Sequence, residues 1–138
     1  MEMVKIMCGL KGTGKTKELI KMANEDIKTS DGDIVFIEDN SEYILNLNHN
    51  IRYINAMEFD IKDTETFHGF LCGIIAEDYD IRKIYIDGLY NIVKLQNRKL
   101  KNFLDELEEL GEKFNIDFVI SVSCDPKEVS NELENYII

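Results

Sequence analysis

The residues best suited to chemistry lie near the start of the chain, in the segment GLKGTGKT. Gly9, Gly14, Lys15 and Thr16 occupy every fixed position of the pattern G-x-x-x-x-G-K-[ST]. Glycines allow backbone torsions in which N–H groups face an anion, and the lysine adds a positive charge beside them. A helix that follows would add the partial positive charge of its N-terminus. We therefore predict that this segment cradles phosphate groups.

Within this loop, backbone groups and side chains have different expected roles. Lys15 is expected to reach the β- and γ-phosphates of a nucleotide and to support catalysis, and the Thr16 hydroxyl is expected to bind Mg²⁺. Lys11 could contact the γ-phosphate or a partner, or remain a solvent-exposed loop lysine. The residues expected to surround the phosphates are Gly9, Leu10, Lys11, Gly12, Thr13, Gly14, Lys15 and Thr16.

A second chemical group follows the apolar segment KIYID, which ends at Asp87. An aspartate at the carboxyl end of a strand can hold Mg²⁺, directly or through water. Ligands of open α/β sheets bind at that end of the strands. The dipeptide DG could also be only a turn that ends the strand. Beside the first motif, however, we predict that Asp87 and Thr16 share one Mg²⁺ site.

Together, the two motifs resemble those of the P-loop NTPase superfamily. GLKGTGKT matches its Walker A motif, and Asp87 matches its Walker B aspartate. The resemblance implies a three-layer α/β/α fold with a mainly parallel sheet, which binds ATP and Mg²⁺. GTP is disfavoured because the chain contains no N-K-x-D sequence for guanine, so an adenine nucleotide is the expected ligand. At finer scale the chain resembles small bacterial ATP-binding proteins, some of which carry a twitching-motility ATPase label.

The RecA-like strand order, that of the additional-strand branch, is favoured, but one residue departs from that branch. A glutamate usually follows the Walker B aspartate there and polarises water, whereas this chain has Gly88. Glu38 or Asp39, at the end of another predicted strand, could replace it as a base or could be exposed loop acids. Ser123, at the end of the last predicted strand, could sense the γ-phosphate or simply end the strand.

These residues leave three functions open. The leading hypothesis is a protein that binds Mg-ATP, with weak or partner-dependent hydrolysis. The second is a small-molecule kinase with Glu38 or Asp39 as base, in which Arg98 of the basic segment KLQNRKLK could be a lid or finger residue. The third is a nucleotide-sensing module without catalysis.

The elements that must position these residues alternate along the chain. Apolar segments predict strands at 3–8, 33–38, 83–89 and 117–123. Helical periodicity predicts helices at 16–27, 64–76 and 97–114, and Asp125-Pro126 is typical of the start of a final helix. Segments 43–47 and 51–54 predict a hairpin or a loop with an edge strand. The alternation predicts the α/β class, with helices on both faces of a parallel sheet.

Composition limits the partners of the chain. Its 138 residues, 44% of them hydrophobic, are predicted to form one domain over residues 1–138. A net charge of −11 disfavours nucleic acid and anionic membranes, although it allows a local phosphate site. No apolar segment approaches the ~20 residues that span a bilayer, so no membrane insertion is expected. A protein partner or a homo-oligomer remains possible.

The cysteines indicate the redox state of the compartment in which the protein works. Cys8, Cys72 and Cys124 are far apart, odd in number and without the spacing of metal ligands. All three lie in apolar segments, where a free thiol behaves as a small hydrophobic side chain. We therefore expect free thiols in a reducing cytoplasm.

Overall fold

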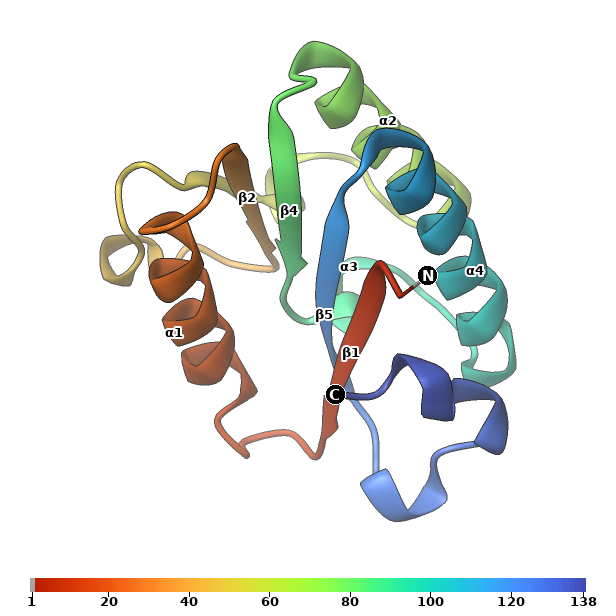
Figure 1. Cartoon of the computed structure of the whole chain (residues 1–138). Coiled ribbons are helices and arrows are strands. Elements are labelled where there is room, and N and C mark those ends of the chain that lie inside the picture. Colours follow the sequence, from red (N-terminus) through yellow and green to blue (C-terminus); the bar gives the residue numbers. More distant parts are fainter. Residues whose placement is uncertain (1) are drawn as a thin grey trace.

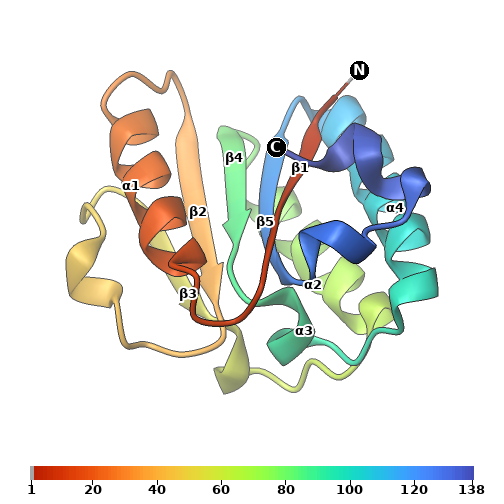
Figure 2. The same ribbon diagram turned by 90° about the horizontal axis from the view of Figure 1, so that it is seen from below.

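In a computed structural model, which describes residues 2–138, five parallel strands form one sheet between two layers of helices (Figures 1 and 2). The predicted α/β class, the parallel sheet and the helices on both faces are thus confirmed. Across the sheet the strands follow the order β1-β5-β4-β2-β3. They are β1 (Val4–Gly9), β2 (Asp33–Glu38), β3 (Arg52–Asn55), β4 (Ile81–Ile86) and β5 (Asp117–Ser123).

The position of β5 decides how the two motifs meet. It lies between β1, which leads into the glycine loop, and β4, which leads into Asp87. One strand, β5, therefore separates the strands that lead into the two motifs. Gly9 is paired with Ser123 and Ile86 with Ile120, so all three strands end at the same edge of the sheet. We call this edge the carboxyl edge.

The two faces of the sheet have separate cores. Helix α1 (Lys15–Ile27) covers one face, and α2 (Thr64–Glu77), α3 (Leu89–Ile92) and α4 (Asn97–Phe114) cover the other (Figure 2). Successive side chains of a strand point to opposite faces. Phe36 accordingly packs in the core under α1, whereas Ile37 packs in the core under α2 and α4. Within residues 2–138, no helix combines the length and apolar character needed to cross a bilayer.

Segment 43–55 contains an edge strand and no hairpin. Strand β3 pairs with β2 in parallel, so the alternative of a loop followed by an edge strand is confirmed and the hairpin is wrong. The loop includes a short 3-10 turn, η1 (Ile44–Asn46). Asn24 of α1 donates to the Asn46 carbonyl at 2.9 Å and accepts from the Asn48 N–H at 2.8 Å. These two bonds hold the loop against α1.

The predicted final helix is wrong. The C-terminal segment forms two 3-10 turns, η3 (Pro126–Glu128) and η4 (Asn131–Tyr136). The Asp125 side chain accepts from the Lys127 N–H, and Ser130 caps a second turn by accepting from the Glu132 N–H. Each cap begins a turn, but the extended residues between them prevent one continuous helix. The chain then returns to the outer edge of β1, where Ile137 pairs with Ile6.

Two of the three cysteines are not free. The structure joins Cys8, next to the end of β1, to Cys124, just after β5, in a disulfide with 5.5 Å between the Cα atoms. The prediction of free thiols is therefore wrong for this pair and confirmed for Cys72. The pairing arises from the register of β1 and β5, because a sequence separation of 116 residues gives no local signal.

Candidate functional site

The loop between β1 and α1 has a backbone that requires glycine. Gly12 and Gly14 have φ angles of 84° and 85°, in the left-handed region that side chains disfavour. A Cβ added to Gly9 would lie 3.0 Å from Oγ1 of Thr13, whose hydroxyl donates to the Leu10 carbonyl at 2.7 Å. The loop is therefore tightly folded, with its residues in close contact with one another.

Lys15 begins α1 and is folded back over this loop. Its Nζ donates to the Gly9 carbonyl at 2.7 Å and to the Leu10 carbonyl at 2.9 Å. Partial burial lowers the pKa of Lys15, and the nearby Asp87 carboxylate opposes that change. Among residues 2–138, no side chain caps the N-terminus of α1 at Gly14. The first N–H groups of the helix and the lysine ammonium thus form one positive end that suits an anion.

Asp87 is buried and held by two hydroxyl groups. Thr16 Oγ1 donates to its Oδ2 at 2.8 Å, and Ser121 Oγ donates to its Oδ1 at 2.6 Å. The Gly88 N–H donates in turn to Ser121 Oγ at 2.8 Å. The exposed fractions of Asp87 and Ser121 are only 4% and 1%. The loop threonine and Asp87 are therefore in direct contact, and β5 adds Ser121 as a third member.

This set of oxygens fits a magnesium ion. Mg²⁺ prefers hard oxygen ligands and is bound in proteins through one or two carboxylates together with substrate phosphates. The Thr16 hydroxyl and the Asp87 carboxylate offer such atoms 2.8 Å apart, next to Lys15 and the glycine loop. Thr16 and Asp87 are thus the residues that would hold the ion.

The two candidate bases at the end of β2 lie in different surroundings. Glu38 is fully buried and is not among the residues that line the cleft beside the loop. Its Oε2 accepts from the Tyr53 hydroxyl at 2.7 Å, and its Oε1 has no partner within residues 2–138. Burial raises the pKa of Glu38 to about 7, although the hydrogen bond from Tyr53 opposes the rise.

Asp39, in contrast, faces the cleft. Its Oδ2 accepts from Asn91 Nδ2 at 2.7 Å, and its Oδ1 accepts from Asn40 Nδ2 at 2.8 Å. Asn91 belongs to α3, which follows Asp87 directly, so Asp39 reaches across from β2 to the end of β4. Of the two acids, only Asp39 is positioned to touch a ligand in the cleft.

The cleft beside the loop has a volume of about 510 Å³, which suits a small ligand. Most of the predicted site residues meet there. The lining residues are Lys11, Gly12, Gly14, Lys15, Thr16, Lys17, Asp39, Asn40, Glu42, Tyr43, Asp87, Gly88, Asn91, Ser121 and Ser123. Arg98 lines a different cavity of about 530 Å³, between α4 and the C-terminal turns.

The sequence prediction missed several of these residues. Ser121 had one available signal, since it is a polar residue inside an otherwise apolar strand. Asn91 and Tyr53 had none, because each meets its carboxylate only through contacts between neighbouring elements.

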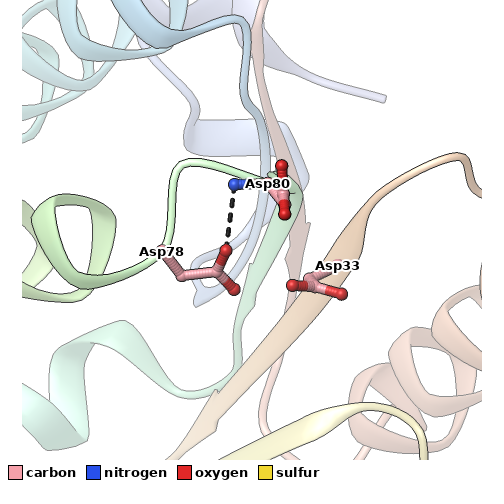
Figure 3. A group of neighbouring side chains, drawn as sticks. All are labelled: Asp33, Asp78 and Asp80. Atoms are coloured by element: carbon pink, nitrogen blue, oxygen red, sulfur yellow. Dashed lines mark hydrogen bonds between the residues drawn. The ribbon is translucent and has the colours of Figure 1, made fainter.

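A second acidic group lies at the opposite, amino edge of the sheet (Figure 3). Asp33 begins β2, and Asp78 and Asp80 precede β4, so that one carboxylate oxygen of each lies within 4.8 Å of the others. The pKa of Asp33 is raised by its hydrogen bond with Asp78, with smaller effects from burial and neighbouring charge. These acids face one another at the amino edge, whereas the glycine loop lies at the carboxyl edge, after β1.

Comparisons with protein-family models and with curated proteins found no relative. No protein-family model matches the chain, and no curated protein matches it. Function is therefore inferred from the chemistry of the cleft.

Proposed function

We propose that this protein binds Mg-ATP in the cleft at the carboxyl edge and hydrolyses it slowly or only with a partner. The observation that carries the proposal is the hydrogen bond between Thr16 and Asp87 beside a lysine-bearing glycine loop. It brings a hydroxyl and a carboxylate to the end of a positive helix N-terminus, although 71 residues separate them in sequence. A glycine-rich turn without a ligand has no need of this combination.

Each residue of the loop has a role in this proposal. Lys15 turns from the carbonyls of Gly9 and Leu10 toward the β- and γ-phosphates, and the loop N–H groups bind the remaining phosphate oxygens. Thr16 and Asp87 hold the magnesium ion, which neutralises charge on the phosphates when bound. Ser123 stands at the end of β5, where its hydroxyl can meet the γ-phosphate.

Slow turnover is expected because Gly88 cannot polarise water. Asp39 is the acid that lines the cleft, so it is the residue we assign to that task.

The choice of adenine over guanine depends on the absence of N-K-x-D from the sequence. We also propose a cytoplasmic location.

A small-molecule kinase is the second candidate, and the position of Asp39 favours it. The same carboxylate could accept a proton from a substrate hydroxyl in place of water. The cleft is open enough for a second small ligand, whereas Arg98 lies outside the residues that line it. A nucleotide sensor without catalysis is the third candidate.

The test begins with binding. Mg-ATP and Mg-GTP are titrated into the wild type, Lys15→Ala and the control Lys21→Ala, an exposed lysine on the same helix. We expect ATP to bind more tightly than GTP, and Lys15→Ala to weaken ATP binding by roughly a hundredfold or more, since a charge-assisted contact is lost. Equal affinities for the wild type and Lys15→Ala would contradict the proposal.

Catalysis is then measured with γ-labelled ATP, with and without cell extract. Phosphate release that Asp87→Ala abolishes supports hydrolysis. Transfer of the label to a metabolite supports the kinase, and binding without either reaction supports the sensor.

A further inference from the structure

We propose that Asn91 is a positioning residue that holds Asp39 over Gly88, so that a carboxylate from β2 takes the place of the glutamate missing after Asp87. The inference depends on the proposed function, because it names the group that orients the attacking water. It concerns the Asp39–Asn91–Gly88 group, which lies between the ends of β2 and β4.

The space beside Gly88 is already occupied. A Cβ added to Gly88 would lie 3.1 Å from Oδ2 of Asp39 and 3.4 Å from Nδ2 of Asn91. The φ angle of Gly88 is 76°, which a residue with a side chain rarely adopts. A glutamate at this position would therefore meet both a strained backbone and a carboxylate already in its place. The Asp39 carboxylate therefore occupies space that is available only because residue 88 is glycine.

The short helix α3 explains why Asn91 can hold the carboxylate. Leu89 and Ile92 are buried on either side of it and anchor α3 in the core. The N–H of Asn91 donates to the Gly88 carbonyl at 2.9 Å, which fixes the turn. Asn91 itself is exposed and points its amide to Asp39 Oδ2 at 2.7 Å. The anchored turn thus presents an amide donor in a fixed direction.

The partners of Asp39 leave each of its oxygens able to accept a further hydrogen bond. Its two oxygens accept from the neutral amides of Asn91 and Asn40, one each, and it forms no ion pair with Lys15 within residues 2–138. A carboxylate oxygen has two lone pairs, so each oxygen keeps acceptor capacity. Two amides fix the orientation of the group without neutralising its charge.

The reaction assigned to this group is the hydrolysis of the terminal phosphate. The water oxygen forms a bond to the γ-phosphorus, and the bond to the β,γ-bridging oxygen breaks, its electron pair staying with ADP. Asp39 accepts the proton that the water loses and then releases it to solvent. Asp39 is the catalytic residue in this step, and Asn91 acts only through it.

The variants are Asn91→Ala, Asp39→Asn and the exchange Asp39→Asn with Asn91→Asp, with Asn102→Ala as the control. Asn102 is an exposed helical amide outside the cleft lining. For each protein we measure the Kd of Mg-ATP and the single-turnover rate of phosphate release at excess enzyme. A positioning role predicts a Kd within about twofold of wild type for Asn91→Ala, while its rate falls roughly tenfold.

General-base catalysis contributes about 10²–10⁴-fold, so Asp39→Asn should lose at least a hundredfold in rate. The exchange variant places the carboxylate on α3 and the amide on β2, and should recover part of that loss. A readout independent of activity is the side-chain amide NMR signal of Asn91, identified by its absence in Asn91→Ala. It should shift in Asp39→Asn and not in Asn102→Ala.

The outcomes separate this inference from the proposed function. If the wild type does not bind Mg-ATP, the proposed function itself fails. If it binds Mg-ATP but releases no phosphate above background, or if Asn91→Ala is as fast as Asn102→Ala, the inference is overturned and nucleotide binding stands. Thermal melting of each variant identifies any that fails to fold, and the exchange variant then tests the same pair of residues with both groups present.

Discussion

Strands β2 and β4 carry acidic residues at both of their ends, and the two ends differ in how those acids are held. At the carboxyl edge, Asp87 accepts from two hydroxyls and Asp39 from two amides. At the amino edge, the carboxylates of Asp33, Asp78 and Asp80 lie close to one another (Figure 3). A backbone N–H of this group, that of Asp80, donates to Asp78 at 2.9 Å.

The difference shows that a cluster of carboxylates is not sufficient to build a site. The carboxyl edge combines acids with donors from other elements, a glycine loop and the positive end of a helix of 13 residues. At the amino edge, none of the three acids forms an ion pair within residues 2–138, and the charges of Asp78 and Asp80 act unfavourably on that of Asp33. Ligands in parallel α/β sheets bind at the carboxyl edge.

The largest expected effect concerns the covalent link at the carboxyl edge. Cys8 and Cys124 close a loop of 116 residues, and breaking such a link lowers the free energy of unfolding by about 3–4 kcal/mol. Urea unfolding of the oxidised protein, with and without dithiothreitol, measures the change. Cys72→Ser should respond to the reductant as the wild type does, whereas Cys8→Ser should not respond. An equal response of both variants would contradict a stabilising role for this disulfide.

The next effect is a pH dependence of stability that distinguishes buried Glu38 from the acids that face solvent. The pKa of Glu38 is about 7 in the folded chain and 4.5 ordinarily, so between these values the folded state holds a proton that the unfolded state has lost. The stability contributed by protonated Glu38 is present below pH 4.5 and is lost as the pH rises through 7. At ~1.4 kcal/mol per pKa unit, the total is roughly 3 kcal/mol.

Glu38→Gln cannot ionise and should therefore lose this pH dependence. The free energy of unfolding is measured from pH 4 to pH 8, a range that includes both the ordinary and the raised pKa of Glu38. Glu42→Gln, an exposed acid of the following loop, is the matched control and should keep the slope of the wild type. Parallel curves for the wild type and Glu38→Gln would show that Glu38 is not the group responsible.

The same comparison shows what the sequence could predict. The loop motif determined where Lys15 and Thr16 would lie, because a strand, a tight turn and a helix are continuous in the chain. Asp87 could be placed beside them because an aspartate that ends a buried strand lies at the carboxyl edge. Neither inference needs the register of the sheet, and both residues line the cleft.

The rest depended on contacts that no local pattern encodes. Glu38 and Asp39 are consecutive, yet one is buried against Tyr53 and the other faces the cleft. The Cys8–Cys124 pair depends on the register of β1 with β5. The C-terminal caps indicated where turns begin but could not indicate how long each continues.

A smaller effect tests the donors of the carboxyl edge. Ser121→Ala removes the hydroxyl that donates to Asp87 and leaves the Gly88 N–H without its acceptor. Loss of a buried hydrogen-bond partner costs about 1–3 kcal/mol, so unfolding in urea should show a decrease of roughly 2 kcal/mol. Ser123→Ala, two residues later on the same strand but exposed, should change the stability little. Equal effects of the two substitutions would mean that the Asp87 contact adds nothing.

The smallest effect has the opposite sign and comes from the amino edge. The raised pKa of Asp33 means that its carboxylate destabilises the fold once the pH exceeds that pKa. Asp33→Asn should therefore raise the free energy of unfolding near neutral pH by a few tenths of a kcal/mol, the size of exposed charge effects. Asp31→Asn is the matched control, because Asp31 is also exposed but pairs with Arg82 at 3.4 Å and should lose stability instead.

Neither of these amino-edge substitutions should alter the Kd of Mg-ATP, since both residues lie at the other end of β2 from the cleft. Urea unfolding and nucleotide titration of the two variants therefore give two independent tests of the difference between the amino and carboxyl edges. Added Mg²⁺ or Ca²⁺ gives a further check, because a cation bound by Asp33, Asp78 and Asp80 would stabilise the wild type and not Asp33→Asn. Such a selective gain would mean that carboxylates without positive partners can form a site after all.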